Sequence, residues 1–195
     1  WWDRNAPLPG DDDRRFSWVE AERIVLDAFT GFDPEMAATA QLFFERNWID
    51  AAPRPGKSSG AFSHPVTPSA HPYILMNFAG KSRDVMTLAH EMGHGVHQCL
   101  ASANGYLMSD TPLTLAETAS VFAEMLAFRH LVDSAQDAVT RRVLLAGKVE
   151  DMLNTVVRQI AFHNFETAFH AARGEGELTA GEISDVWMDT QRAAL

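Results

Sequence analysis

The stretch His90-Glu91-Met92-Gly93-His94 governs the interpretation of this 195-residue sequence. On a helix, residues i and i+4 lie on one face, a turn apart. Both imidazoles can therefore reach a single metal ion, while Glu91 leans toward the same side and can act on a water molecule there. Two histidines and a carboxylate at this spacing are the arrangement that a zinc hydrolase requires. The stretch predicts a helix that carries part of a metal site.

A third ligand is needed, because a catalytic zinc ion takes three protein ligands and keeps a fourth position for water. Our candidate is Glu117, which lies 23 residues after His94 in a helical stretch of small and apolar residues. A carboxylate is costly to bury there unless it is paired or binds a metal. The spacing leaves room for a loop and an antiparallel return. Cys99 is the single cysteine, so we expect neither a cysteine-based zinc site nor an internal disulfide.

Three further residues are weaker candidates for the site, and Gly93 is a packing position near it. His97 continues the histidine face, but a fourth protein ligand would close the position that water needs, so we expect it to support a ligand or to pack. Glu124 either accepts a hydrogen bond from a ligand imidazole or is solvated. Asn77 lies in an apolar strand that either is purely structural or pairs with an extended peptide. Gly93 costs about 1 kcal/mol relative to Ala within a helix, which indicates close packing against another backbone.

The composition excludes several classes of function. Hydrophobic residues make up 46% of the chain, as in globular proteins, and the net charge is -10. We expect no nucleic-acid partner, because the sequence has no basic stripe. We expect no membrane partner, because no apolar run approaches the roughly 20 residues of a span. No signal peptide is visible, and with a single cysteine this predicts a cytoplasmic protein.

Periodicity and capping signals predict a mainly α fold. Ser17 with Glu20 forms a capping box, and Asp33 with Pro34 starts a second helix. We expect one catalytic-core region over residues 1–195, in which residues 1–16 form an extended lead-in and a small antiparallel sheet precedes the motif helix. The predicted helices cover about 17–32, 33–47, 84–103, 113–132, 136–173 and 179–194, and the predicted strands cover 61–63 and 73–78.

Four segments, at 60–63, 72–78, 88–97 and 116–124, resemble the thimet oligopeptidase and oligoendopeptidase F family of zinc metallopeptidases, especially its oligoendopeptidase F branch. The resemblance implies a zincin-like helical metallopeptidase core that hydrolyses internal peptide bonds of oligopeptides in a deep channel. It assigns one Zn²⁺ ion to His90, His94 and Glu117. It also assigns Glu91 as the general base that activates the zinc-bound water, and zinc lowers the pKa of that water toward about 7.

Members of that family are far longer, so we expect this chain to be a fragment that retains the zinc site. Their C-terminal segment carries a histidine and tyrosines that bind the substrate, whereas the tyrosines here are Tyr73 and Tyr106. An oxyanion donor lowers a barrier by about 3 kcal/mol, so the isolated chain should be slow. Apolar surface that the missing parts would cover also predicts self-association.

Two alternatives to an endopeptidase remain open at this point. A carboxypeptidase or dipeptidyl carboxypeptidase could use the same three zinc ligands, but it needs a cationic pocket for the substrate's C-terminus. An inactive zinc-binding module could serve assembly or peptide capture. The cleavage positions in a peptide library distinguish the endopeptidase, the carboxypeptidase and the inactive module.

Overall fold

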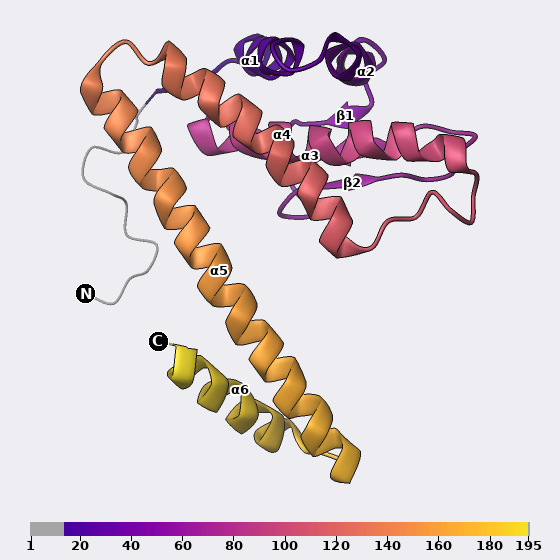
Figure 1. The fold of residues 1–195 in the computed structure, drawn as a ribbon, viewed down its shortest axis with the longest axis vertical. Coiled ribbons are helices and arrows are strands. Elements are labelled where there is room, and N and C mark those ends of the chain that lie inside the picture. The colour runs from indigo at the N-terminus through magenta and orange to yellow at the C-terminus, as the bar shows by residue number, and fades with distance from the viewer. Residues whose placement is uncertain (1–13, 195) are drawn as a thin grey trace. The chain divides into compact units, whose positions relative to one another are not determined.

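The structure, a computed structural model, describes residues 14–194 and confirms a mainly helical fold with a small sheet (Figure 1). These residues form two compact units: the first extends to Arg141, and the second begins at Arg142. The helices are α1 (Trp18–Thr30), α2 (Pro34–Glu45), α3 (Ser82–Ala101), α4 (Leu113–Ser134), α5 (Ala138–Glu175) and α6 (Ala180–Ala194), with a 3-10 turn η1 (Ser102–Asn104), and the strands are β1 (Ile49–Asp50), β2 (Phe62–His64) and β3 (Tyr73–Leu75).

The predicted starts of α1 and α2 are confirmed. Ser17 and Glu20 form a reciprocal capping box, and Asp33 accepts a hydrogen bond from the Glu35 amide one residue after Pro34. Most of the predicted lead-in falls on residues 1–13, outside the described part of the chain. At its end, Phe16 is 5% exposed and its amide donates to the Gly80 carbonyl at 2.8 Å. The chain is therefore anchored to the core before the first helix begins.

The sheet differs in one respect from the prediction. Its strand order is β1-β3-β2, with β3 antiparallel to β2 as expected but parallel to β1. The sheet is therefore mixed, and β1 was missed because two residues are too few to show an alternating pattern. Strand β3 ends at Leu75, short of the predicted residue 78, yet the amide of Met76 still donates to the carbonyl of Asp50 in β1, and the amide of Phe78 donates to that of Ala51 just after it.

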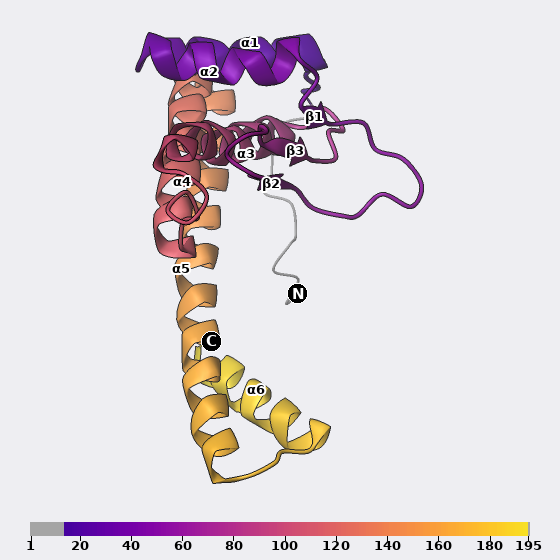
Figure 2. The ribbon, with the colours of Figure 1, turned by 90° about the vertical axis from the view of Figure 1, so that its right-hand side faces the viewer.

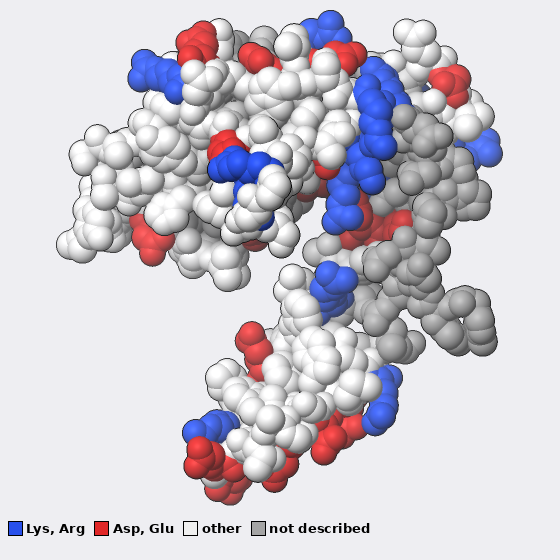
Figure 3. Space-filling model, turned by 180° about the vertical axis from the view of Figure 1, so that it is seen from behind, with Lys and Arg blue, Asp and Glu red and all other residues white. Residues whose placement is uncertain are grey.

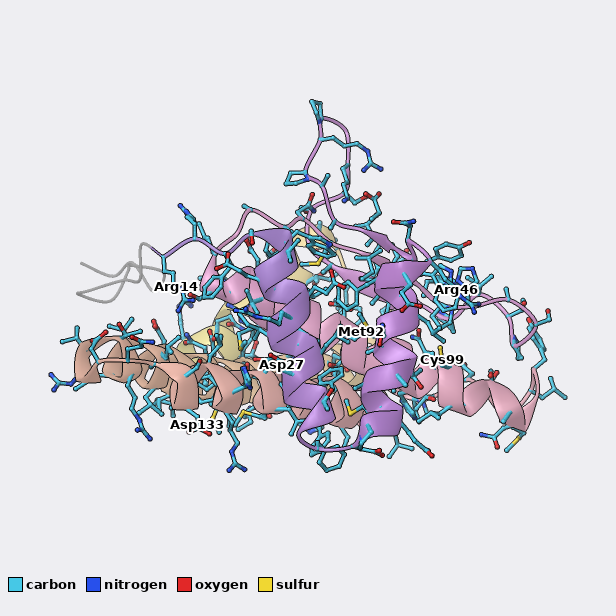
Figure 4. All side chains as sticks on the ribbon, turned by 90° about the horizontal axis from the view of Figure 1, so that it is seen from above. Arg14, Asp27, Arg46, Met92, Cys99 and Asp133 are labelled. Carbon is cyan, nitrogen blue, oxygen red and sulfur yellow. The ribbon has the colours of Figure 1, made fainter. Side chains whose placement is uncertain are left out.

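Helix α3 contacts α1, α2, α4 and the sheet, so each of its faces has a different neighbour. Met92 is fully buried beneath α1 and α2, which lie side by side above it (Figure 4). Figure 2 shows the same two helices as a layer on one side of α3. Burying a methionine side chain of this kind contributes roughly 1.5–3 kcal/mol. The apolar face of the motif helix thus fixes its position in the first unit.

Two glycines allow α3 to approach its neighbours closely. A Cβ atom on Gly93 would lie 2.6 Å from the Ala123 Cβ and 2.7 Å from the Ala119 carbonyl oxygen, both on α4. A Cβ atom on Gly95 would lie 2.7 Å from the Phe43 ring of α2 and 3.5 Å from Ile74 of β3. A Cβ atom at these distances would force its neighbours to shift, so glycine is favoured at both positions. The close packing predicted at Gly93 is confirmed.

The second unit is a helical hairpin of α5 and α6. Trp187 on α6 packs against Phe162 and Phe165 on α5, with ring centroids 5.7 and 5.1 Å apart. Of the described residues of α5, Ala161 alone is buried. Figure 3 shows a broad uncharged area over the hairpin with acidic and basic side chains at its margins. Large apolar side chains exposed along α5 are Val139, Leu145, Val149, Met152, Leu153, Val156, Val157, Ile160 and Phe162.

None of the described helices is both long and apolar enough to cross a bilayer.

We predict that Gly93→Ala destabilises the protein, because the added methyl group collides with the α4 backbone. Overpacking of this kind costs about 1–3 kcal/mol. Gly147→Ala is the matched control: it also lies within a helix, but its Cβ would have no neighbouring atom within 4 Å, and it should stabilise α5 by up to about 1 kcal/mol. Urea unfolding followed by circular dichroism measures both. Unchanged stability of Gly93→Ala would contradict the close crossing.

Candidate active site

Helices α3 and α4 bring His90, His94 and Glu117 together. Ligand atoms of the three residues lie within 4.8 Å of one another. The Glu117 carboxylate faces both histidines, with Oε2 3.2 Å from His90 Nε2 and Oε1 3.6 Å from His94 Nε2. The two histidines lie one turn apart on α3, and α4 supplies the carboxylate from across the Gly93 crossing. Two imidazole nitrogens and one carboxylate are a donor set typical of catalytic zinc.

Glu124 lies on the other side of His90. Its Oε2 is 3.1 Å from His90 Nδ1, which assigns Nδ1 as the donor of the neutral ring. Nε2 then carries a lone pair and faces a carboxylate oxygen of Glu117, and two acceptors at 3.2 Å repel each other unless a cation or a proton lies between them. A carboxylate–histidine pair behind a metal is a common supporting arrangement. The residues present therefore fit a divalent metal ion.

Ser120 contacts Glu117, and the sequence analysis did not identify it. Its side chain is fully buried, and its hydroxyl lies 2.8 Å from Glu117 Oε2 and 3.1 Å from the Glu117 carbonyl oxygen. The hydroxyl can therefore hold one carboxylate oxygen on the histidine side. Serine carries no distinctive pattern within a helix, but its position three residues after a candidate ligand is a spacing that could have indicated it.

Glu91 is only 6% exposed, and its carboxyl group lies close enough to His90 and Glu117 for their charges to act on it. Burial raises the pKa of its carboxyl group to about 7, and the charge of Glu117 acts in the same direction. His90 and a hydrogen bond from the Ser63 backbone amide act to lower this pKa. A buried carboxyl group beside two histidines, held by a backbone amide, has the properties of a general base.

The two histidines have opposite electrostatic environments. Burial acts to lower the pKa of His90, but the Glu124 hydrogen bond and the surrounding carboxylates outweigh it, so this pKa is raised. The pKa of His94 is lowered, chiefly by burial and also by His90 and His97, against the opposing effect of Glu117. His97 thus lies near the site. It is not a member of the three-residue cluster that the described part of the chain offers to a metal.

The hypothesis of peptide pairing along the strand of Asn77 is wrong for β3. This strand lies between β1 and β2, so both of its edges are already paired. Asn77 itself lies beyond the end of β3, and its side-chain amide donates to the carbonyls of Ser58 and Gly60 at 2.9 and 3.2 Å. Asn77 therefore holds the loop that leads into β2. The position of β3 within the sheet depends on β1, which the sequence did not reveal.

Comparison with known proteins identifies the family of the chain. Residues 34–195 match the model of peptidase family M3. The chain belongs to this family. It is 32% identical over 172 residues to the chromosomal oligoendopeptidase F of Lactococcus lactis subsp. cremoris, which covers 88% of this chain. It is 30% identical over 193 residues to the oligopeptidase PepF of Bacillus subtilis (strain 168), which covers 98% of this chain. The predicted family is therefore confirmed.

A solved structure of a similar protein has the same fold. The crystal structure of a candidate peptidase from Chlamydophila abortus superposes on 97% of this M3 chain with a TM-score of 0.73 and 27% identity, and this chain covers 32% of that one. The chain likewise spans 28% and 29% of the lengths of the two curated relatives. The shared region is thus about a third or less of each relative, and in this chain it holds the whole two-helix site.

We predict that Glu124→Gln weakens zinc binding by the M3 chain about 10- to 100-fold, as expected when a carboxylate behind a histidine ligand loses its charge. Competition with a chromophoric chelator measures the affinity. Glu166→Gln, on an exposed position of α5, is the control and should bind zinc like the original protein. Equal affinities of the two variants would show that Glu124 does not support the ligand.

Proposed function

We propose that this M3 chain is the catalytic core of a zinc-dependent oligopeptidase that hydrolyses internal peptide bonds. The observation that carries the proposal is the convergence of His90, His94 and Glu117 beside the buried carboxyl group of Glu91. In this assignment the two histidines and Glu117 hold one Zn²⁺ ion. The names of the oligoendopeptidase F relatives support oligopeptides as the substrate class.

Each protein group has a distinct task in the proposed reaction. When bound, zinc supplies Lewis-acid polarisation of the substrate carbonyl and acidifies water. Glu91 takes the proton from the attacking water and later passes it to the leaving amine. Glu124 keeps His90 in the tautomer whose Nε2 faces the cluster, and Ser120 orients Glu117. Low exposure of Glu91 limits competing contact with bulk water.

We favour internal cleavage over C-terminal trimming because the relatives from Lactococcus lactis subsp. cremoris carry the name oligoendopeptidase F.

We propose oligopeptides as the partners of the site and a cytoplasmic location, in keeping with a single cysteine, Cys99, in a reducing compartment. The apolar side chains exposed along α5 favour self-association of the isolated chain.

We predict that Glu91→Gln keeps zinc binding but lowers peptide turnover by about 10²- to 10⁴-fold, because the amide cannot accept the proton. Zinc content by atomic absorption and hydrolysis of quenched peptides measure the two properties. Glu166→Gln again serves as the control for an unrelated carboxylate. Turnover by Glu91→Gln at the original rate would remove Glu91 from the mechanism.

We also predict internal cuts when the zinc-loaded chain is incubated with a peptide library and the products are identified by mass spectrometry. Peptides amidated at the C-terminus should be cleaved as fast as free acids, because no terminal carboxylate needs to bind. Loss of one or two residues from free-acid peptides alone would support the carboxypeptidase alternative instead. Intact peptides beside bound zinc would support a zinc-binding module without activity.

A further inference from the structure

Ser63 of strand β2 makes hydrogen bonds to two side chains of α3. Its hydroxyl donates to Gln98 Oε1 at 2.8 Å, and its carbonyl accepts from Gln98 Nε2 at 3.2 Å. Its backbone amide donates to the Glu91 carboxylate. Three polar atoms of a single strand residue are thus bound by two side chains of the motif helix. Both contacts with Gln98 are partly buried, which strengthens them relative to surface hydrogen bonds.

The geometry of a strand explains why these contacts act together. The amide and carbonyl of one strand residue point to the same side, and Ser63 lies opposite Ile74 in the antiparallel register. With its amide on Glu91 and its carbonyl on Gln98, Ser63 directs both groups away from β3 and toward α3. Helix α3 therefore occupies the outer edge of β2 at this residue, and Figures 1 and 2 show β2 running beside α3.

The spacing on α3 matches this arrangement. Gln98 follows Glu91 by seven residues, which is two helical turns, so both side chains lie on the same face. The Gln98 amide group fixes Ser63 from one end, and this fixes the direction in which the Ser63 amide points. A carboxylate held by one backbone amide is only as well oriented as the strand that supplies the amide.

We propose that Ser63 and Gln98 form a clamp that orients the Glu91 carboxylate, which makes both of them positioning residues for the catalytic base. The inference rests on the proposed function in so far as it concerns the base of that reaction. The clamp itself is a property of the folded chain without substrate. Misplacement of a catalytic group by about 1 Å can reduce turnover by about 10²-fold, so a clamp of this kind has a measurable effect.

The test compares Gln98→Ala with the original 195-residue chain. We expect the Ser63 amide to exchange with deuterated solvent about tenfold faster in the variant, measured by NMR, because its carboxylate partner loses alignment. We expect zinc affinity to stay within about twofold, since neither residue contacts the three ligands. For peptides that the original chain hydrolyses, the kcat of the variant should be about 10- to 100-fold lower, with an unchanged KM.

Control variants separate the clamp from a general loss of structure. Gln41→Ala removes another helix-surface glutamine, one that donates to Glu45, and should change none of the three readouts. Ser63→Thr keeps the hydroxyl and should behave like the original chain, whereas Ser63→Ala should follow Gln98→Ala. If Gln98→Ala does not fold, Gln98→Glu, which keeps the size but loses the Nε2 donor, takes its place in the comparison.

Two results would overturn the clamp: unchanged exchange of the Ser63 amide in the Gln98 variant, or unchanged kcat in a variant whose amide has become exposed. Failure of the proposed function appears differently. In that case the original chain cleaves no peptide, while amide exchange still reports whether Gln98 controls the Ser63 contact with Glu91.

Discussion

The close crossing of α3 and α4 is the contact on which the candidate site depends. At Gly93 a single Cβ atom would collide with the Ala119 carbonyl and with Ala123. Because the two helix backbones approach this closely, the Glu117 carboxylate on α4 can reach two histidines on α3. A wider separation would leave the carboxylate beyond their reach, whatever the spacing within each helix.

The five residues of the motif divide among the faces of one helix. His90 and His94 face Glu117, Glu91 faces β2, Met92 lies under α1 and α2, and Gly93 meets α4. Candidate site residues and packing residues therefore occupy the same one and a half turns of α3. Packing of Met92 and Gly93 sets the orientation of the helix. This orientation directs His90 and His94 toward Glu117, and Glu91 toward β2.

Local sequence predicted the helices well, because capping residues and 3.6-residue periodicity act over a few positions. The capping box at Ser17 and Asp33 before Pro34 are examples. It failed at β1, whose two residues have no periodicity of their own and whose parallel pairing depends on where α2 ends. The same failure led to the idea that a peptide could pair with β3, a strand whose edges are both occupied.

The sequence by itself determined which residues could serve a metal and a proton, because His-x-x-x-His with an adjacent glutamate is a spacing that any helix converts into a shared face. It also identified Glu117 from an uncommon carboxylate in a small, apolar stretch. Only the tertiary structure decided the partners of these residues: Glu124 on His90, Ser120 on Glu117, and Ser63 with Gln98 at Glu91. Ser63 and Gln98 lie 35 residues apart, and no local sequence pattern shows that packing brings their hydroxyl and amide groups into hydrogen-bonding range.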